Sequence, residues 1–102
     1  MQHYTDKEGF NGIASQPAWV FLARRPPGDH PVGAYFTSLG PETRHLAKRL
    51  RIPRSKLAYR FELNGADDLL ALPGGRGAYI SYSPVDYTVE RPRQVFHGST
   101  GL

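Results

Sequence analysis

The chain has 102 residues, of which 39% are hydrophobic and 12% aromatic, and its formal net charge is +4. This composition predicts one folded domain, residues 1–102, and excludes an intrinsically disordered tail. The absence of cysteine excludes disulfides, thiolate metal sites and a cysteine nucleophile, and no apolar run approaches the roughly 18 residues of a membrane-spanning helix.

The first ten residues, MQHYTDKEGF, predict a strand that runs directly into a helix. Thr5 and Glu8 have the spacing of a capping box, with Thr5 as the N-cap. Apolar residues then follow at helical spacing, so a short helix is expected over residues 6–15. Two glycines weaken this helix, and Pro17 ends it.

Two apolar runs of strand length follow, AWVFLA at 18–23 and VGAYFTSL at 32–39, with the turn-rich segment RRPPGDHP between them. A second helix is predicted over residues 41–50, because Pro41 suits a first helical position and leucine and alanine recur on one side. The segment KLAYRFEL, residues 56–63, alternates apolar and polar side chains, which is typical of a half-buried strand.

In the last third of the chain, residues 64–77 are predicted to be a loop with about one helical turn. Three further strands are expected at AYISYS, DYTVE and RQVFH. The element order is then β-α-β-β-α-β followed by more strands, which predicts an α+β fold with mainly antiparallel sheet. A doubly wound nucleotide-binding fold is not expected, because the crossover helices that join parallel strands are missing.

The positive charge is concentrated in one segment between Glu42 and Glu62, which contains no acidic residue. Its basic residues are Arg44, Lys48, Arg49, Arg51, Arg54, Lys56 and Arg60. Such a block suits phosphate, either in a nucleic acid or in a nucleotide. A solvated basic face is the equally weighted alternative.

Common catalytic patterns are missing from the sequence. No metal-ligand spacing relates the four histidines, which are His3, His30, His45 and His97. The segment GGRG at 74–77 is not a phosphate loop, since no Lys-Ser/Thr pair follows it, and no serine lies in a nucleophile elbow. The remaining candidates are polar-aromatic clusters at two strand ends, HYT at 3–5 and GAYFTS at 33–38.

These two clusters, roughly thirty residues apart and followed by a helix, resemble the first two signature motifs of the ADP-ribosyltransferases. The resemblance is closest to the toxin-type branch named for a His-Tyr-Asp signature. It extends over HYTDKEGFNGI, GAYFTSLGP, LAKRLRIP, FELNG and VDYTVERPRQVFHG. It implies a fold of two facing, roughly orthogonal β-sheets that hold NAD in the cleft between them.

The resemblance also implies roles for individual residues in NAD binding. His3 would hydrogen-bond a ribose hydroxyl, and backbone groups at Tyr4 or Thr5 would hold the carboxamide. Tyr35 would stack on the nicotinamide ring, where an aromatic face suits a cationic pyridinium. The implied cofactor-binding set is His3, Tyr4, Thr5, Tyr35, Phe36 and Thr37.

The third signature position is an acid, which would stabilise the positive charge that develops on the ribose as nicotinamide leaves. Better-known transferases begin a strand with Glu-Tyr-Ile, and Ala78 of AYIS stands at that place. In the His-Tyr-Asp branch the acid falls later. Asp86 is then the best positional match and Glu90 the second, although Asp86 also fits a turn residue after Pro84.

The resemblance therefore implies an NAD-dependent mono-ADP-ribosyltransferase, the toxin domain of a bacterial effector, that releases nicotinamide and modifies a protein or nucleic acid. Such a domain needs no metal and no membrane. The resemblance implies action in the cytoplasm of the producing or the target cell, and it allows for delivery as part of a larger secreted toxin and for a cognate immunity protein.

Three alternatives stay open at this point. An NAD glycohydrolase would use the same site with water as the acceptor. A degenerate transferase would bind NAD without reacting. A non-enzymatic module would use the basic segment to bind nucleic acid.

Overall fold

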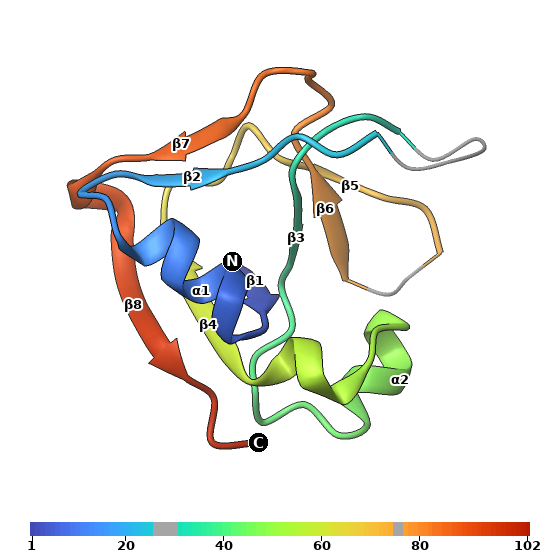
Figure 1. Cartoon of the computed structure of the whole chain (residues 1–102). Coiled ribbons are helices and arrows are strands. Elements are labelled where there is room, and N and C mark those ends of the chain that lie inside the picture. The colour runs from blue at the N-terminus through green and yellow to red at the C-terminus, as the bar shows by residue number, and fades with distance from the viewer. Residues whose placement is uncertain (26–30, 75–76) are drawn as a thin grey trace.

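The computed structural model describes residues 1–25, 31–74 and 77–102 of the chain (Figure 1). Most of the predicted turn RRPPGDHP, including His30, and the centre of GGRG lie outside these ranges. The strands in the described ranges form two sheets, and all neighbouring strands in them are antiparallel. The α+β class and the antiparallel pairing expected from the sequence are confirmed.

The larger sheet has six strands in the order β5-β6-β3-β1-β4-β8. Their bounds, in the same order, are Leu70–Ala71, Ala78–Ile80, Tyr35–Thr37, Gln2–Thr5, Tyr59–Leu63 and Gln94–Ser99. β1 therefore lies inside the sheet, with β3 on one side and β4 on the other.

The smaller sheet is a ribbon of β2 (Trp19–Phe21) and β7 (Tyr87–Val89). Figure 1 shows this ribbon passing across one end of the larger sheet, crosswise to β3. Both strands are short and alternate buried with partly or fully exposed residues, as expected for strands with one face on a core.

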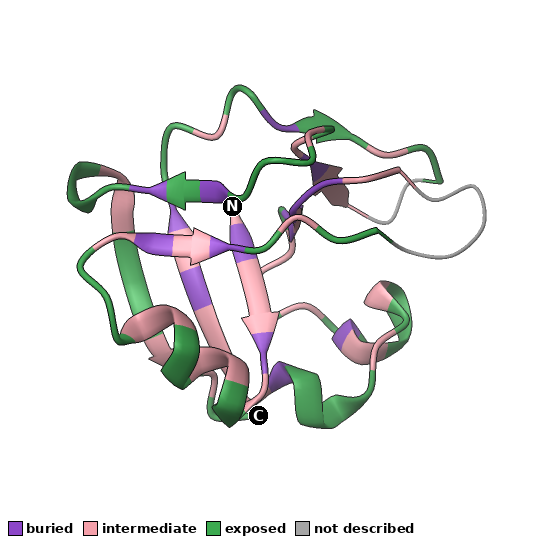
Figure 2. Cartoon of the chain, turned by 45° about the horizontal axis from the view of Figure 1, so that its top comes forward, coloured by how far each residue is buried: buried purple, intermediate pink, exposed green. Residues whose placement is uncertain are grey.

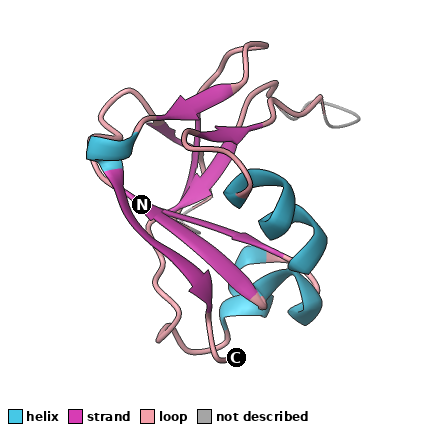
Figure 3. Cartoon of the chain, turned by 60° about the vertical axis from the view of Figure 1, so that its left-hand side comes forward, coloured by secondary structure: helices cyan, strands magenta, loops and turns pink. Residues whose placement is uncertain are grey.

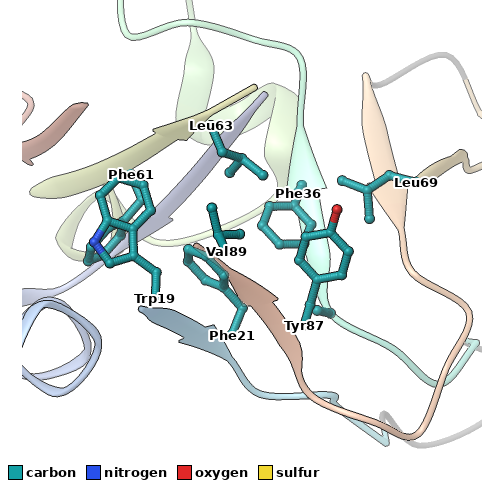
Figure 4. Packing of buried hydrophobic residues seen from close by; sticks show 9 residues of the cluster. Trp19, Phe21, Phe36, Phe61, Leu63, Leu69, Tyr87 and Val89 are labelled. Carbon is teal, nitrogen blue, oxygen red and sulfur yellow. The ribbon is translucent and has the colours of Figure 1, made fainter. Parts of the chain in front are cut away.

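The hydrophobic core lies between the ribbon and the larger sheet (Figure 4). Trp19 and Phe21 of the ribbon pack edge-on against Phe61 of β4, with ring centroids 4.9 and 5.6 Å apart. Phe61 and Val89 are fully buried, and each such side chain contributes about 1.5–3 kcal/mol through removal from water. Figure 2 shows the buried residues where the two sheets face each other, whereas the outer sides of the helices are exposed.

Most of the helical segments gather at one end of the larger sheet, and a single short one lies apart from them (Figure 3). α1 (Lys7–Ala14) packs through Phe10, whose ring stacks on Tyr59 and Phe61 at 4.7 and 5.2 Å. α2 (Leu46–Leu50) and the short 3-10 helix η1 (Arg54–Leu57) follow β3, and a second 3-10 helix, η2 (Arg91–Arg93), precedes β8. None of the described helices has the length and apolar character needed to cross a bilayer.

The predicted β-α-β-β-α-β order is confirmed as far as β4, and residues 95–99 of VFHGST belong to the closing strand β8, as expected. The N-cap of the first helix was predicted one residue too early. Thr5 is buried at the end of β1, where it pairs with Tyr59. Asp6 caps the helix instead, and its Oδ1 accepts a hydrogen bond from the Gly9 N–H at 2.9 Å.

The second helix is shorter than predicted, because Pro41 lies in a turn closed by a hydrogen bond from the Thr43 N–H to the Gly40 carbonyl. The strand predicted over 56–63 begins only at Tyr59, since Lys56 and Leu57 belong to η1. The loop predicted over 64–77 contains the two-residue strand β5.

Gly9 and Gly12 of α1 offer a matched pair of substitutions. A Cβ at Gly9 would lie 2.1 Å from Oγ1 of the buried Thr5, whereas a Cβ at Gly12 would meet nothing within 4 Å. We expect Gly9→Ala to lower the free energy of unfolding by about 1–3 kcal/mol through overpacking. Gly12→Ala should raise it by about 0.5–1 kcal/mol, because alanine is the better helix former.

Urea denaturation of both variants measures these changes. Equal stabilisation by the two alanines would contradict the close contact between α1 and the end of β1.

Candidate functional site

An opening between β1 and β3 organises the candidate site. β1 forms four residue pairs with β4 but only one with β3, between Gln2 and Thr37. β3 meanwhile continues its pairing with β6 as far as Tyr35. The two central strands of the sheet therefore stop pairing immediately after Gln2.

The hydrogen-bond pattern shows which backbone groups of β1 face this opening. Met1 and Leu63 exchange hydrogen bonds in both directions, from Met1 N to Leu63 O at 3.2 Å and from Leu63 N to Met1 O at 2.9 Å. Backbone polar groups alternate between the two neighbours of an antiparallel strand. His3 and Thr5 therefore direct theirs at β4, and Tyr4 directs its N–H and C=O into the opening.

The same pattern applies to β3 on the other side. Ser81 N donates to Ala34 O, and Ser38 N donates to Gly77 O. The residues between them alternate, so Tyr35 and Thr37 direct their backbone groups at β1. Thr37 pairs with Gln2, but no residue pair joins Tyr35 to Tyr4.

His3 bridges the opening with its side chain. Its Nδ1 lies 3.0 Å from the carbonyl oxygen of Tyr35, and since a carbonyl only accepts, Nδ1 carries the proton and donates. The ring packs against Phe21 of the ribbon and Phe36 of β3, with centroids 4.8 and 5.7 Å away. The imidazole is thus fixed in both position and tautomer.

The same surroundings keep His3 neutral. Burial lowers the pKa of His3 from 6.5 to about 4, opposed by the hydrogen bond to Tyr35 and reinforced by the charge of Arg24. Its Nε2 therefore carries a free lone pair at neutral pH. No partner for Nε2 lies among the described residues, and no fully buried side-chain nitrogen or oxygen in that part of the chain lacks one, so Nε2 reaches an open surface.

One of the two hollows that His3 lines is a cleft of about 460 Å³ at the opening, a size within the range of small-molecule sites. All six residues predicted to bind the cofactor line it: His3, Tyr4, Thr5, Tyr35, Phe36 and Thr37. Leu50, Ile52, Pro53 and Leu72 add an apolar wall to this lining. A second hollow of about 410 Å³ lies between α1 and β2, and it shares His3, Thr5 and Arg24 with the cleft.

The cleft is lined from both faces of the larger sheet. His3 and Phe36 point toward the core, whereas the side chains of Tyr4 and Tyr35 point to the opposite face because strand residues alternate. The Tyr4 hydroxyl donates to the Leu39 carbonyl at 2.8 Å, and the Tyr35 hydroxyl donates to the Pro31 carbonyl. Burial raises the pKa of Tyr35, so this hydroxyl keeps its proton. His3 therefore meets the carbonyl of Tyr35, not its ring.

The charged lining is positive. Arg24 and Lys56 line the cleft, and none of the described lining residues is acidic. Lys56 pairs with Asp6 at 2.6 Å near the surface, and Arg24 is close enough to lower the pKa of His3. Such a lining favours an anionic ligand. No group of three metal-binding side chains gathers in the described ranges.

The candidate acids lie apart from this lining. Asp86 is exposed, and its Oδ1 accepts a hydrogen bond from the Ala23 N–H at 2.9 Å, which holds the ends of β2 and β7 together. Asp86 does not line the cleft, and its hydrogen-bond partner Ala23 directly precedes the lining residue Arg24. Glu90 lies at the other end of β7, before η2. Ala78, at the position of the expected glutamate, lines the cleft with a methyl group.

Sequence reasoning missed Arg24 and the apolar wall of Leu50, Ile52 and Leu72. Arg24 had a weak signal, since it is a basic residue directly after an apolar strand. No signal in the sequence indicated the apolar wall, because Leu50, Ile52 and Leu72 come from a helix end and two loops that only the fold brings together.

Comparison with known proteins leaves the family of this chain open. No protein-family model matches the chain, and searches of curated proteins and of solved structures gave no significant match.

The neutral His3 gives the fold a specific pH dependence. Below pH 6.5 the unfolded chain binds a proton at His3 that the folded chain does not bind until about pH 4. The free energy of unfolding should therefore fall as the pH drops through this window, by up to about 1.4 kcal/mol per pH unit.

The control is His3→Asn, in which the amide still donates to Tyr35 but does not titrate. Urea denaturation at several pH values should show a flatter dependence for this variant between pH 6.5 and 4. Parallel curves for the two proteins would show that His3 is not held neutral.

Proposed function

We propose that this chain is an NAD-dependent mono-ADP-ribosyltransferase and that the nicotinamide riboside end of NAD lies in the opening between β1 and β3. One observation carries the proposal. The six residues chosen from two motif segments far apart in the sequence line a single cleft, with a neutral histidine at its centre. A fold that used these residues only for packing has no need to separate its two central strands there.

The groups that face the opening match the polar groups of nicotinamide riboside. The free Nε2 of His3 accepts a hydrogen bond from a ribose hydroxyl, because Nδ1 is already committed to Tyr35. The Tyr4 N–H and C=O suit a carboxamide, which needs one donor and one acceptor. Of the two positions implied by the resemblance, Tyr4 fits and Thr5 does not, since the Thr5 backbone pairs with β4.

The positive lining suits the other half of NAD. Arg24 lies at the cleft with no ion-pair partner among the described residues, and Lys56 lies there paired with Asp6. A pyrophosphate gains charge-assisted hydrogen bonds from such groups. The ring of Tyr35 lines the same cleft, and its role in stacking on nicotinamide stays a prediction.

In the proposed reaction, the bond between ribose C1′ and the nicotinamide nitrogen breaks, and its electron pair leaves with neutral nicotinamide. The acceptor atom attacks C1′ and gives up its proton as the new bond forms. Positive charge develops on the ribose between these events and is stabilised by a nearby carboxylate. Asp86 is our candidate for this carboxylate, because its partner Ala23 adjoins the cleft residue Arg24.

NAD binding is the first test. At a concentration 100 times its Kd, NAD should raise the free energy of unfolding by about 2.7 kcal/mol, and nicotinamide should be released. His3→Ala should slow that release by about 100-fold or more. His97→Ala is the matched control, since His97 lies on β8 outside the cleft lining, and it should release nicotinamide at the original rate.

A chain that neither gains stability from NAD nor releases nicotinamide does not have the proposed function. Release without any transfer to a cell extract would favour the glycohydrolase alternative.

Asp86→Asn separates the two roles of Asp86. The amide oxygen can still accept the Ala23 N–H, so the free energy of unfolding should change by less than about 1 kcal/mol. If the carboxylate acts on the ribose, nicotinamide release should fall by about 100-fold while NAD affinity is kept. Calorimetric binding and a release assay measure the two effects.

The lining also favours a second candidate function. Because none of its described residues is acidic, the chain could bind NAD without cleaving it. Full stabilisation by NAD together with no nicotinamide release, in the original chain as well as in Asp86→Asn, would support that alternative.

A further inference from the structure

The segment after β3 carries a strongly positive surface, which we call the basic surface. It consists of Arg44, Lys48, Arg49, Arg51 and Arg54, all of them exposed. The two ion pairs found in the described ranges use the other basic residues of the segment, Lys56 with Asp6 and Arg60 with Glu62. Within those ranges, the five cations of the basic surface face no acidic partner.

The fold places this surface beside the cleft. Leu46 of α2 is buried and Leu50 lines the cleft, so the inner side of this short helix is apolar. Lys48 and Arg49 point the other way. Arg51 ends the helix with φ 56°, and its N–H returns to the Lys48 carbonyl. One segment thus forms a cleft wall with its inner side and the basic surface with its outer side.

We propose that the basic surface docks a single-stranded nucleic acid, which lies along α2 and η1 at the edge of the cleft. The role of this strand as the acceptor of ADP-ribose rests on the proposed function. Its docking on the basic surface does not. Phosphodiester groups are the ligands that a row of unpaired arginine and lysine side chains prefers.

The composition of the surface favours a nucleic acid over an acidic protein. Protein–protein interfaces have an apolar, aromatic centre that is poor in charge, whereas interfaces with nucleic acids are polar and strongly positive. The large exposed apolar residues all lie outside residues 41–58: Leu22, Leu70, Tyr82, Val85, Val95, Phe96 and Leu102. The basic surface therefore lacks the apolar centre that a protein partner needs.

The shape favours a single strand over a duplex. α2 has five residues and η1 has four, too short for a helix that reads base edges in a major groove. The adjoining cleft of about 460 Å³ has room for unpaired groups of a strand but not for a double helix.

Fluorescence anisotropy tests the docking without NAD. The probes are a labelled RNA strand of about 20 nucleotides, the DNA strand of the same sequence, and the duplex. We expect at least one of the single strands to bind more tightly than the duplex, with an affinity that falls steeply as NaCl rises from about 50 to 200 mM. Arg49→Glu should weaken that binding several-fold and reduce the salt slope by about one.

Arg91→Glu is the matched control. Arg91 is exposed, and Arg91→Glu changes the net charge by the same amount as Arg49→Glu. Arg91 lies in η2, which leads into β8 at the Leu63 end of β4 and is therefore far along the strand from η1. This variant should bind the strand as the original chain does. Equal weakening of strand binding by the two variants would show a general charge effect and overturn the proposal. A poly-glutamate peptide that binds as tightly as the strand would also overturn it.

The two proposals can fail separately. If the strand docks through Arg49 but NAD is neither bound nor cleaved, the proposed function fails and the docking surface stands. If nicotinamide is released and no strand binds at about 50 mM salt, the docking proposal fails alone.

Discussion

The hydrogen bond from His3 Nδ1 to the Tyr35 carbonyl is the interaction on which the candidate site depends. It joins two strands that have stopped pairing, and it does so from the core side of the sheet. Without it, the described hydrogen-bonded contacts between β1 and the β3 segment would be the Gln2–Thr37 pair and the bond from the Tyr4 hydroxyl to the Leu39 carbonyl. The same bond fixes the histidine tautomer, so His3→Ala removes a structural contact together with the ring, whereas His3→Asn keeps a donor to Tyr35 and removes the ring alone.

The aromatic core supports this arrangement. Phe21 reaches His3 from the ribbon and Phe36 reaches it from β3, so the imidazole forms part of the contact between the two sheets. The packing that stabilises the fold therefore also removes the ring from water and keeps it neutral. The ribbon acts on the site through this contact even though none of the residues in β2 or β7 lines the cleft.

Much of the element order was predictable from the sequence, because apolar alternation and the positions of proline decide it locally. The residues at which the helices and strands begin and end were less predictable. Thr5 and Asp6 are both good N-caps, and the choice between them is made by the pairing of Thr5 with Tyr59, which is remote in sequence. β5 was missed since two residues are too few to show a period.

The candidate site was predictable in part, for a different reason. The residue types of the two motifs indicated His3 and Tyr35. No sequence pattern, however, indicates where the hydrogen-bonded pairing of two strands such as β1 and β3 ends. That depends on the registers of β1 with β4 and of β3 with β6 together. The position of Asp86 beside Ala23 likewise comes from the pairing of β2 with β7, so its distance from the cleft lining was not foreseeable.

The central place of β1 has a consequence for how the chain folds. Its two neighbours, β3 and β4, begin at Tyr35 and Tyr59, so β1 pairs only with segments that are remote from it in sequence. Such pairings slow folding, because a long loop has to close before any contact stabilises it. His3 and Tyr4 therefore gain their neighbours only when these loops close, and the cleft cannot form before the sheet is paired.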